Sequence, residues 1–109
     1  MTSEVVLKAL DESIEKWRKI ATGRGENKGA KNCALCQLFN YVCQGGCPVM
    51  LYTGRSSCEK TPYYTFVKYC DSKGYFISGE VVLDDTSAEL ALVEMNFLIL
   101  VKKHYEALI

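Results

Sequence analysis

Hydrophobic residues recur at steps of three and four near the start of the chain, with charged residues between them. The recurring positions are Val6, Leu10, Ile14, Trp17 and Ala21. This spacing places side chains on one face of an α-helix, and Gly23 follows it. Glycine commonly ends helices because it adopts the left-handed conformation without strain. The pattern predicts a helix over residues 1–22 that turns one apolar face, anchored by Trp17, toward the core.

The strongest periodic pattern covers residues 86–109. Thr86-x-x-Glu89 has the form of a capping box, in which two side chains bond to backbone amides at a helix start. One face of the predicted helix carries Leu90, Val93, Phe97, Leu100, Val101, His104 and Leu108. We expect this face to lie in the core.

A second apolar face of the same helix carries Leu92, Met95 and Ile99. A small domain of four short elements provides too little core to cover both faces. We therefore predict that these three residues form an interface with a protein partner or with a second copy of the chain.

The middle of the chain shows shorter patterns. Residues 33–44 have helical spacing, and residues 49–52 form a short apolar run typical of a strand or a buried turn. Thr61 and Pro62 are typical of a helix start, because the first helical position needs no N–H donor. Residues 75–83 are rich in β-branched and aromatic side chains, which fits a short β-hairpin.

These elements predict a mainly α fold of about four helices, with a cysteine-rich knuckle over residues 33–66 and a short β-hairpin as an optional addition. Of the 109 residues, 49% are hydrophobic and 24% are charged, as in an ordinary globular domain. A chain of this length has one modest core. We therefore expect a single domain over residues 1–109.

Charge and hydropathy argue against two classes of partner. Lys and Arg number 13, as do Asp and Glu, so the formal net charge is zero and gives no global attraction to a phosphate backbone. No apolar run approaches the roughly 20 residues that cross a membrane. The N-terminal stretch mixes acids and bases and lacks the apolar region of a signal peptide. We expect a cytoplasmic protein without membrane association.

Four cysteines form two close pairs, Cys33-x2-Cys36 and Cys43-x3-Cys47. The first three lie at helical spacing on one face, and two glycines before Cys47 allow the chain to fold back toward them. In a reducing compartment, closely spaced cysteines are more often metal ligands than disulfides. We predict that the four thiolates bind one structural zinc ion in a closed tetrahedral site, with Cys58 as the reserve ligand.

Other interpretations of the cysteines stay open. An iron–sulfur cluster accepts four thiolates, and the cysteines are also compatible with disulfides or with free thiols and no cofactor. Cys33 and Cys36 form a pair suited to thiol redox chemistry, although the strand that precedes such a motif is missing. The single histidine, His104, lies on an apolar helix face. We predict no catalytic residues and no enzymatic activity, and we expect Cys70 to be a core thiol.

Several motifs of the chain also occur together elsewhere. They are Trp17, Gly29-Ala30-x-Asn32-Cys33-Ala34-Leu35-Cys36-Gln37-x-Phe39, Cys43-x3-Cys47-Pro48-Val49, Thr53-Gly54, Cys58-x2-Thr61-Pro62-Tyr63 and Glu94-x-x-Phe97-Leu98. This set resembles a group of small uncharacterised cysteine-motif proteins of bacteria and their phages. Three residues separate the second cysteine pair here, where the group has two. The resemblance implies a phage or bacterial protein and no particular activity.

A binding module is the function that these observations favour. Neutral charge, wide apolar helix faces and seven tyrosines suit a protein partner or a homodimer, because aromatic residues are enriched at interface cores. We predict a metal-stabilised interaction module with a regulatory or accessory role in a phage or its host. Single-stranded nucleic acid is the second choice of partner. The residues available for base stacking and phosphate contact are Tyr52, Tyr63, Tyr64, Arg55, Lys60 and Lys68.

Overall fold

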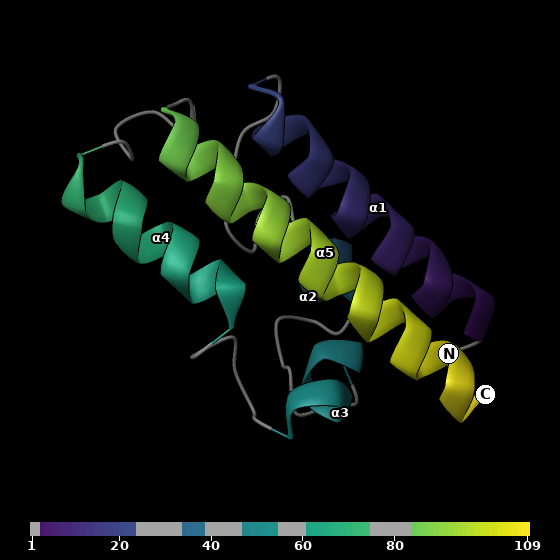
Figure 1. Cartoon of the computed structure of the whole chain (residues 1–109). Helices are drawn as coiled ribbons and strands as arrows, with labels where there is room; N and C mark the ends of the chain where they lie inside the picture. Colours follow the sequence, from purple (N-terminus) through teal and green to yellow (C-terminus); the bar gives the residue numbers. More distant parts are fainter. Residues whose placement is uncertain (1–2, 24–33, 39–46, 55–60, 75–83) are drawn as a thin grey trace.

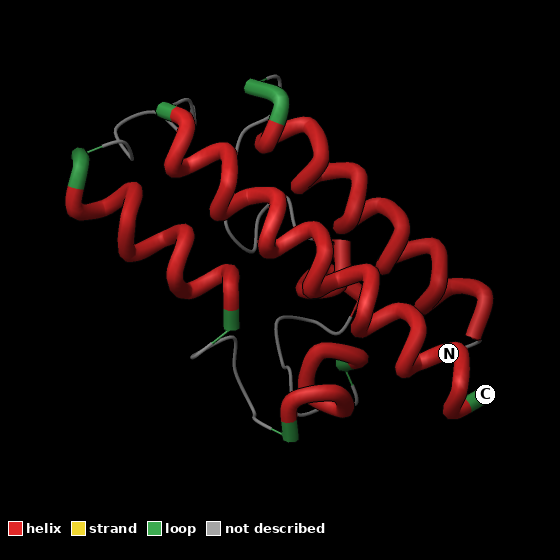
Figure 2. The backbone as a smooth tube through the Cα atoms, in the orientation of Figure 1, coloured by secondary structure: helices red, strands yellow, loops and turns green. Residues whose placement is uncertain are grey.

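The computed structural model describes residues 3–23, 34–38, 47–54, 61–74 and 84–109, and the regular elements among them are helices (Figures 1 and 2). They are α1 (Ser3–Ala21), α2 (Ala34–Leu38), α3 (Pro48–Thr53), α4 (Pro62–Ser72) and α5 (Asp85–Leu108). The predicted mainly α fold class is confirmed. The predicted hairpin at 75–83 lies outside the described residues.

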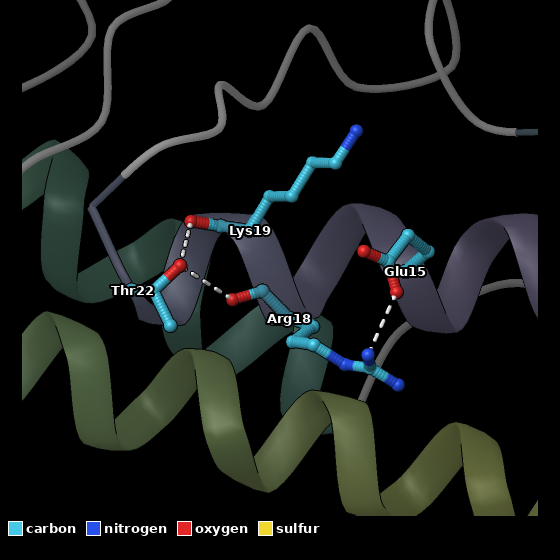
Figure 3. A network of polar contacts seen from close by, with 4 residues as sticks. All are labelled: Glu15, Arg18, Lys19 and Thr22. Atoms are coloured by element: carbon cyan, nitrogen blue, oxygen red, sulfur yellow. Dashed lines mark hydrogen bonds and ion pairs between the residues drawn. The ribbon is translucent and has the colours of Figure 1, made fainter.

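Helix α1 forms as its apolar spacing predicts. Its buried positions are Val6, Ala9, Leu10, Ser13, Ile14, Trp17 and Ile20. Ala21, at the end of the predicted face, is partly buried. Gly23 has φ 77°, the left-handed conformation that ends a helix. Figure 3 shows the polar contacts of this last turn, where the Thr22 hydroxyl donates to the carbonyl oxygens of Arg18 and Lys19 at 3.2 and 3.0 Å.

Helix α4 begins where the Thr-Pro pair predicts. Pro62 occupies its first turn, and Thr61 before it has the extended backbone of a cap residue. Two side chains of α4, Phe66 and Cys70, are at most 1% exposed. Gly74, with φ 72°, follows the last turn. The expectation that Cys70 is a core thiol is therefore confirmed.

The core lies where α1, α4 and α5 meet. Figure 1 shows α5 between α1 and α4, and both neighbours contact it. Trp17 of α1 meets two rings of α4 edge-on, with centroids 4.9 Å from Phe66 and 5.7 Å from Tyr63. The short helices α2 and α3 contact α1 and α5, respectively. The Trp17 ring thus joins α1 to α4, while α5 contacts both helices.

The segment predicted as a strand or buried turn at 49–52 is helical, so this prediction was wrong. Pro48 occupies the first turn of α3, where proline fits a helix well. The helix ends at Gly54, whose φ is 73° and whose N–H donates to the Met50 carbonyl at 2.7 Å. A four-residue apolar run carries no period long enough to separate helix from strand.

The start of α5 also differs from its prediction. The capping box is formed by Asp84 and Ser87, two residues before the predicted Thr86 and Glu89. The Ser87 N–H donates to Asp84 Oδ1 at 2.8 Å, and the Asp84 N–H donates to Ser87 Oγ at 3.1 Å. The Tyr69 hydroxyl donates to Asp84 Oδ2 at 2.5 Å. This cap therefore also joins α5 to α4, a contact that local sequence spacing does not reveal.

The buried face of α5 is displaced by one residue from the predicted one. Its members are Ser87, Ala91, Glu94, Leu98 and Val101. Of the predicted face, Val101 is buried, Leu90, Phe97 and His104 are partly buried, and Val93, Leu100 and Leu108 are exposed. One residue corresponds to a rotation of about 100°. The buried face includes small and polar residues, so the pattern of hydrophobic positions does not predict it.

We expect Asp84→Ala to lower the free energy of unfolding by about 1–2 kcal/mol, because the α5 cap is lost together with a hydrogen bond from Tyr69. Thr86→Ala is the matched control and should change it by less than about 0.5 kcal/mol, since Thr86 is exposed. Urea unfolding followed by circular dichroism measures both. Equal losses in the two variants would contradict the observed cap.

Candidate functional site

The predicted zinc ligands fall largely outside the described part of the chain. Cys33, Cys43 and the reserve ligand Cys58 lie outside the described residues, and Cys36 lies in α2. Among the side chains that the structure describes, no three His, Cys, Asp or Glu residues gather as they would around a metal ion. The zinc site stays a prediction.

Cys47 is the predicted ligand whose environment is described. It precedes α3 directly, in the cap position, and is 5% exposed. Its carbonyl oxygen accepts a hydrogen bond from the Leu51 N–H at 3.0 Å, which closes the first turn of the helix. The buried Pro48 and Val49 follow it. Cys47 is thus held in a fixed position at the edge of the core.

Cys70 has a different environment from the predicted ligands. It is 1% exposed on the core side of α4. Burial raises the pKa of its thiol, and the nearby negative charge of Asp84 raises this pKa further. A raised pKa keeps the thiol protonated at neutral pH and lowers its reactivity. Cys70 is therefore a structural residue and a useful reference for the other cysteines.

The side of α5 that faces away from α1 and α4 carries a line of exposed residues, which we call the outer face. It consists of Glu89, Leu92, Val93, Asn96, Ile99, Leu100 and Lys103. Leu92 is 43% exposed, and Val93 and Leu100 are each 50% exposed. Ile99 is partly buried and the polar members are exposed. An apolar surface with polar residues at its ends is typical of a contact site.

The structure separates the three residues predicted to form an interface. Leu92 lies exposed on the outer face, and Ile99 lies at its edge, partly buried. Met95 and Ile99 are both partly buried and pack against the core cluster. Val93 and Leu100, which the sequence pattern assigned to the core, belong to the outer face. An interface on α5 would thus use a different set of side chains from the predicted one.

Contacts on both flanks hold α5 in its orientation. On the α1 side, Lys102 Nζ lies 2.7 Å from Asp11 Oδ1, and this hydrogen bond raises the pKa of Lys102. On the α3 side, the Tyr52 ring meets Phe97 and His104 edge-on at centroid distances of 5.7 and 5.3 Å. The outer face is therefore a fixed feature of the fold, because α5 is restrained from rotating.

The tyrosines considered for base stacking lie in different environments. Tyr63 is partly buried and its ring packs on Trp17, whereas Tyr64 is 48% exposed. Tyr52 is 40% exposed but its ring edge lies against α5. Among the basic residues, Lys68 is exposed on α4. Arg55 and Lys60 lie outside the described residues.

Glu94 is a feature that the sequence analysis placed in a motif but not in the core. It is 5% exposed and lies on the buried face of α5 between Ala91 and Leu98. Ser13 of α1 is also buried, at 3% exposure. The hydrophobicity of Glu94 gives no signal for burial. Its spacing does, because Glu94 lies three residues after Ala91 and four residues before Leu98, and both of these are buried.

Comparisons with known proteins give no further assignment. Neither the protein-family models, nor the curated proteins, nor the solved structures contain a significant match to this chain. Among the described helices, none is both long enough and apolar enough to cross a membrane.

We expect the stability of the protein to fall as the pH rises above about 8.5, the pKa of an unfolded cysteine. The raised pKa of Cys70 means that the folded state keeps a proton that the unfolded state releases, so this contribution is present at lower pH and is lost through the alkaline range. Urea unfolding at pH 7 and pH 9.5 should show a smaller pH effect in Cys70→Ala than in the native chain. An identical pH effect in both would contradict this assignment.

Proposed function

We propose that this chain is a small metal-stabilised interaction module that binds a protein partner through the outer face of α5. The observation that carries the proposal is the exposure of Leu92, Val93 and Leu100, at 43 to 50%, on a helix whose opposite face lies in the core. Single exposed apolar residues are common on protein surfaces. Three on one face of one helix form a contiguous surface, which is the feature that marks binding sites.

Burial by a partner would stabilise this face. Each of the three side chains leaves about half of its surface in water, so covering it returns on the order of 1 kcal/mol per residue. The face also needs no rearrangement before binding, because Asp11 and Tyr52 restrain α5 from opposite flanks. A preorganised surface loses less conformational entropy on association.

The metal belongs to the same proposal as a structural support. Cys33, Cys36, Cys43 and Cys47 would bind zinc, with Cys58 in reserve, and an iron–sulfur cluster is the alternative. The paired spacing supports this, and so does the buried, fixed position of Cys47. A closed zinc site contributes on the order of 10 kcal/mol to folding. It would brace the connection between α1 and α3 while the partner binds elsewhere.

The resemblance to small cysteine-motif proteins favours a protein of a bacterium or its phage, and the proposal adds an accessory or regulatory role in the cytoplasm. A second candidate is binding of single-stranded nucleic acid. Tyr64 and Lys68 favour it, because both are exposed and lie one turn apart on α4. Such a pair combines base stacking with phosphate contact. Strong salt dependence of binding would identify this second candidate.

We expect protein purified without added metal to hold one zinc ion per chain, measured by native mass spectrometry and elemental analysis. Cys47→Ser should lose the ion because a thiolate ligand is removed. Cys70→Ser is the matched control and should keep it, since Cys70 is a buried thiol outside the predicted ligand set. A fully folded native chain with much less than one metal per chain would exclude the site.

We expect the combined variant Leu92→Glu and Leu100→Glu to remain folded and to lose association, because both side chains are exposed and charge opposes burial in an apolar contact. Val5→Glu is the matched control, since Val5 is 45% exposed on α1. Circular dichroism tests the fold. Sedimentation tests self-association, and quantitative co-purification from host extract, compared between the two variants, tests other partners. Equal association by both variants would contradict the use of this face.

A further inference from the structure

We propose that the outer face of α5 binds the same face of a second copy of this chain, with the two helices antiparallel and the two-fold axis passing beside Asn96. This inference rests on the proposed function and names its partner. It follows from the order of the residues along the face, which is complementary to itself when reversed.

The outer face has the spacing of a helix-pairing seam. One line of this face runs through Glu89, Leu92, Asn96, Ile99 and Lys103, at steps of three, four, three and four, with Ile99 partly buried against the core at the edge of the face. Alternating steps of three and four keep side chains facing a partner helix. Val93 and Leu100 widen the apolar part of the line. From Glu89 to Lys103 the seam runs about 21 Å along the helix.

The residues pair favourably when two such helices meet antiparallel at Asn96. Residues at equal distances on either side of the axis then face each other, so Leu92 meets Leu100 and Val93 meets Ile99. Seven residues from the axis, Glu89 of one chain meets Lys103 of the other. Because the axis repeats every contact, the dimer has two such ion pairs, one at each end of the apolar contact.

A parallel pair does not share this property. It would place Glu89 against Glu89 and Lys103 against Lys103, and like charges at close range oppose association. An unrelated protein partner would require no complementarity of the face with itself. The charge order therefore favours a second copy in one orientation, even though the net charge of the chain is zero.

Asn96 is suited to the position on the axis. It is exposed, and its amide both donates and accepts hydrogen bonds, so two copies related by the axis satisfy each other. A single polar residue in an apolar seam is a known way of fixing register and partner number. The contact is small compared with standard interfaces of 20 to 30 residues a side. We therefore expect a reversible dimer whose population depends on concentration.

Charge exchange tests the arrangement directly. We expect the native chain to show a monomer–dimer equilibrium in sedimentation experiments at low salt. Glu89→Lys alone and Lys103→Glu alone should each weaken the dimer by roughly tenfold, because two attractive pairs become repulsive. The double variant Glu89→Lys with Lys103→Glu should recover the native dissociation constant. Both Glu89 and Lys103 are exposed, and circular dichroism checks that each variant is folded.

The possible results separate this inference from the proposed function. A native chain that stays monomeric up to about millimolar concentration, while Leu92→Glu with Leu100→Glu still abolishes capture of another protein, overturns the dimer and leaves the interaction module intact. A dimer that the double charge variant fails to recover overturns the antiparallel register. A dimer unaffected by every substitution on the outer face overturns both proposals.

Discussion

The contact of Trp17 with Phe66 and Tyr63 is the interaction on which the rest of the structure depends. It fixes α4 against α1, although the two helices are separated in the chain by α2, α3 and their connections. With these rings edge-on, α5 lies between α1 and α4 and contacts both (Figure 1). Because aromatic edge-to-face contacts have narrow geometry, the anchor sets the spacing between the two helices.

The packing of α5 between α1 and α4 decides which face of α5 is buried. A helix set between two neighbours needs small residues where backbones approach closely, and Ser87 and Ala91 meet this need, being 1% and 0% exposed. Leu98 and Val101 fill the space farther along. The cap from Asp84 and its hydrogen bond from Tyr69 then fix the rotation at the α4 end.

Sequence patterns predicted α1, α4 and the presence of α5, because each has long periodicity or clear start and stop residues such as Thr61 and Pro62. They failed where the deciding contact is tertiary. The buried face of α5 includes Glu94, which a hydrophobicity pattern places in solvent, and the capping residue Asp84 also accepts a hydrogen bond from Tyr69 of α4. The predicted zinc ligands rest on sequence spacing, and the burial of Cys47 fits a structural role with or without a metal.

The rotation of α5 also links the fold to the proposed function. Had Leu90, Val93, Phe97 and Leu100 been buried together, as their spacing suggests, the outside of α5 would carry fewer apolar residues. The rotation by one residue moves Val93 and Leu100 outward beside Leu92, and it places Asn96 at the middle of the resulting surface. Stability is maintained because smaller residues suffice on the crowded inner side. The same packing constraint that hides Glu94 therefore creates the surface at which we propose that a second chain binds.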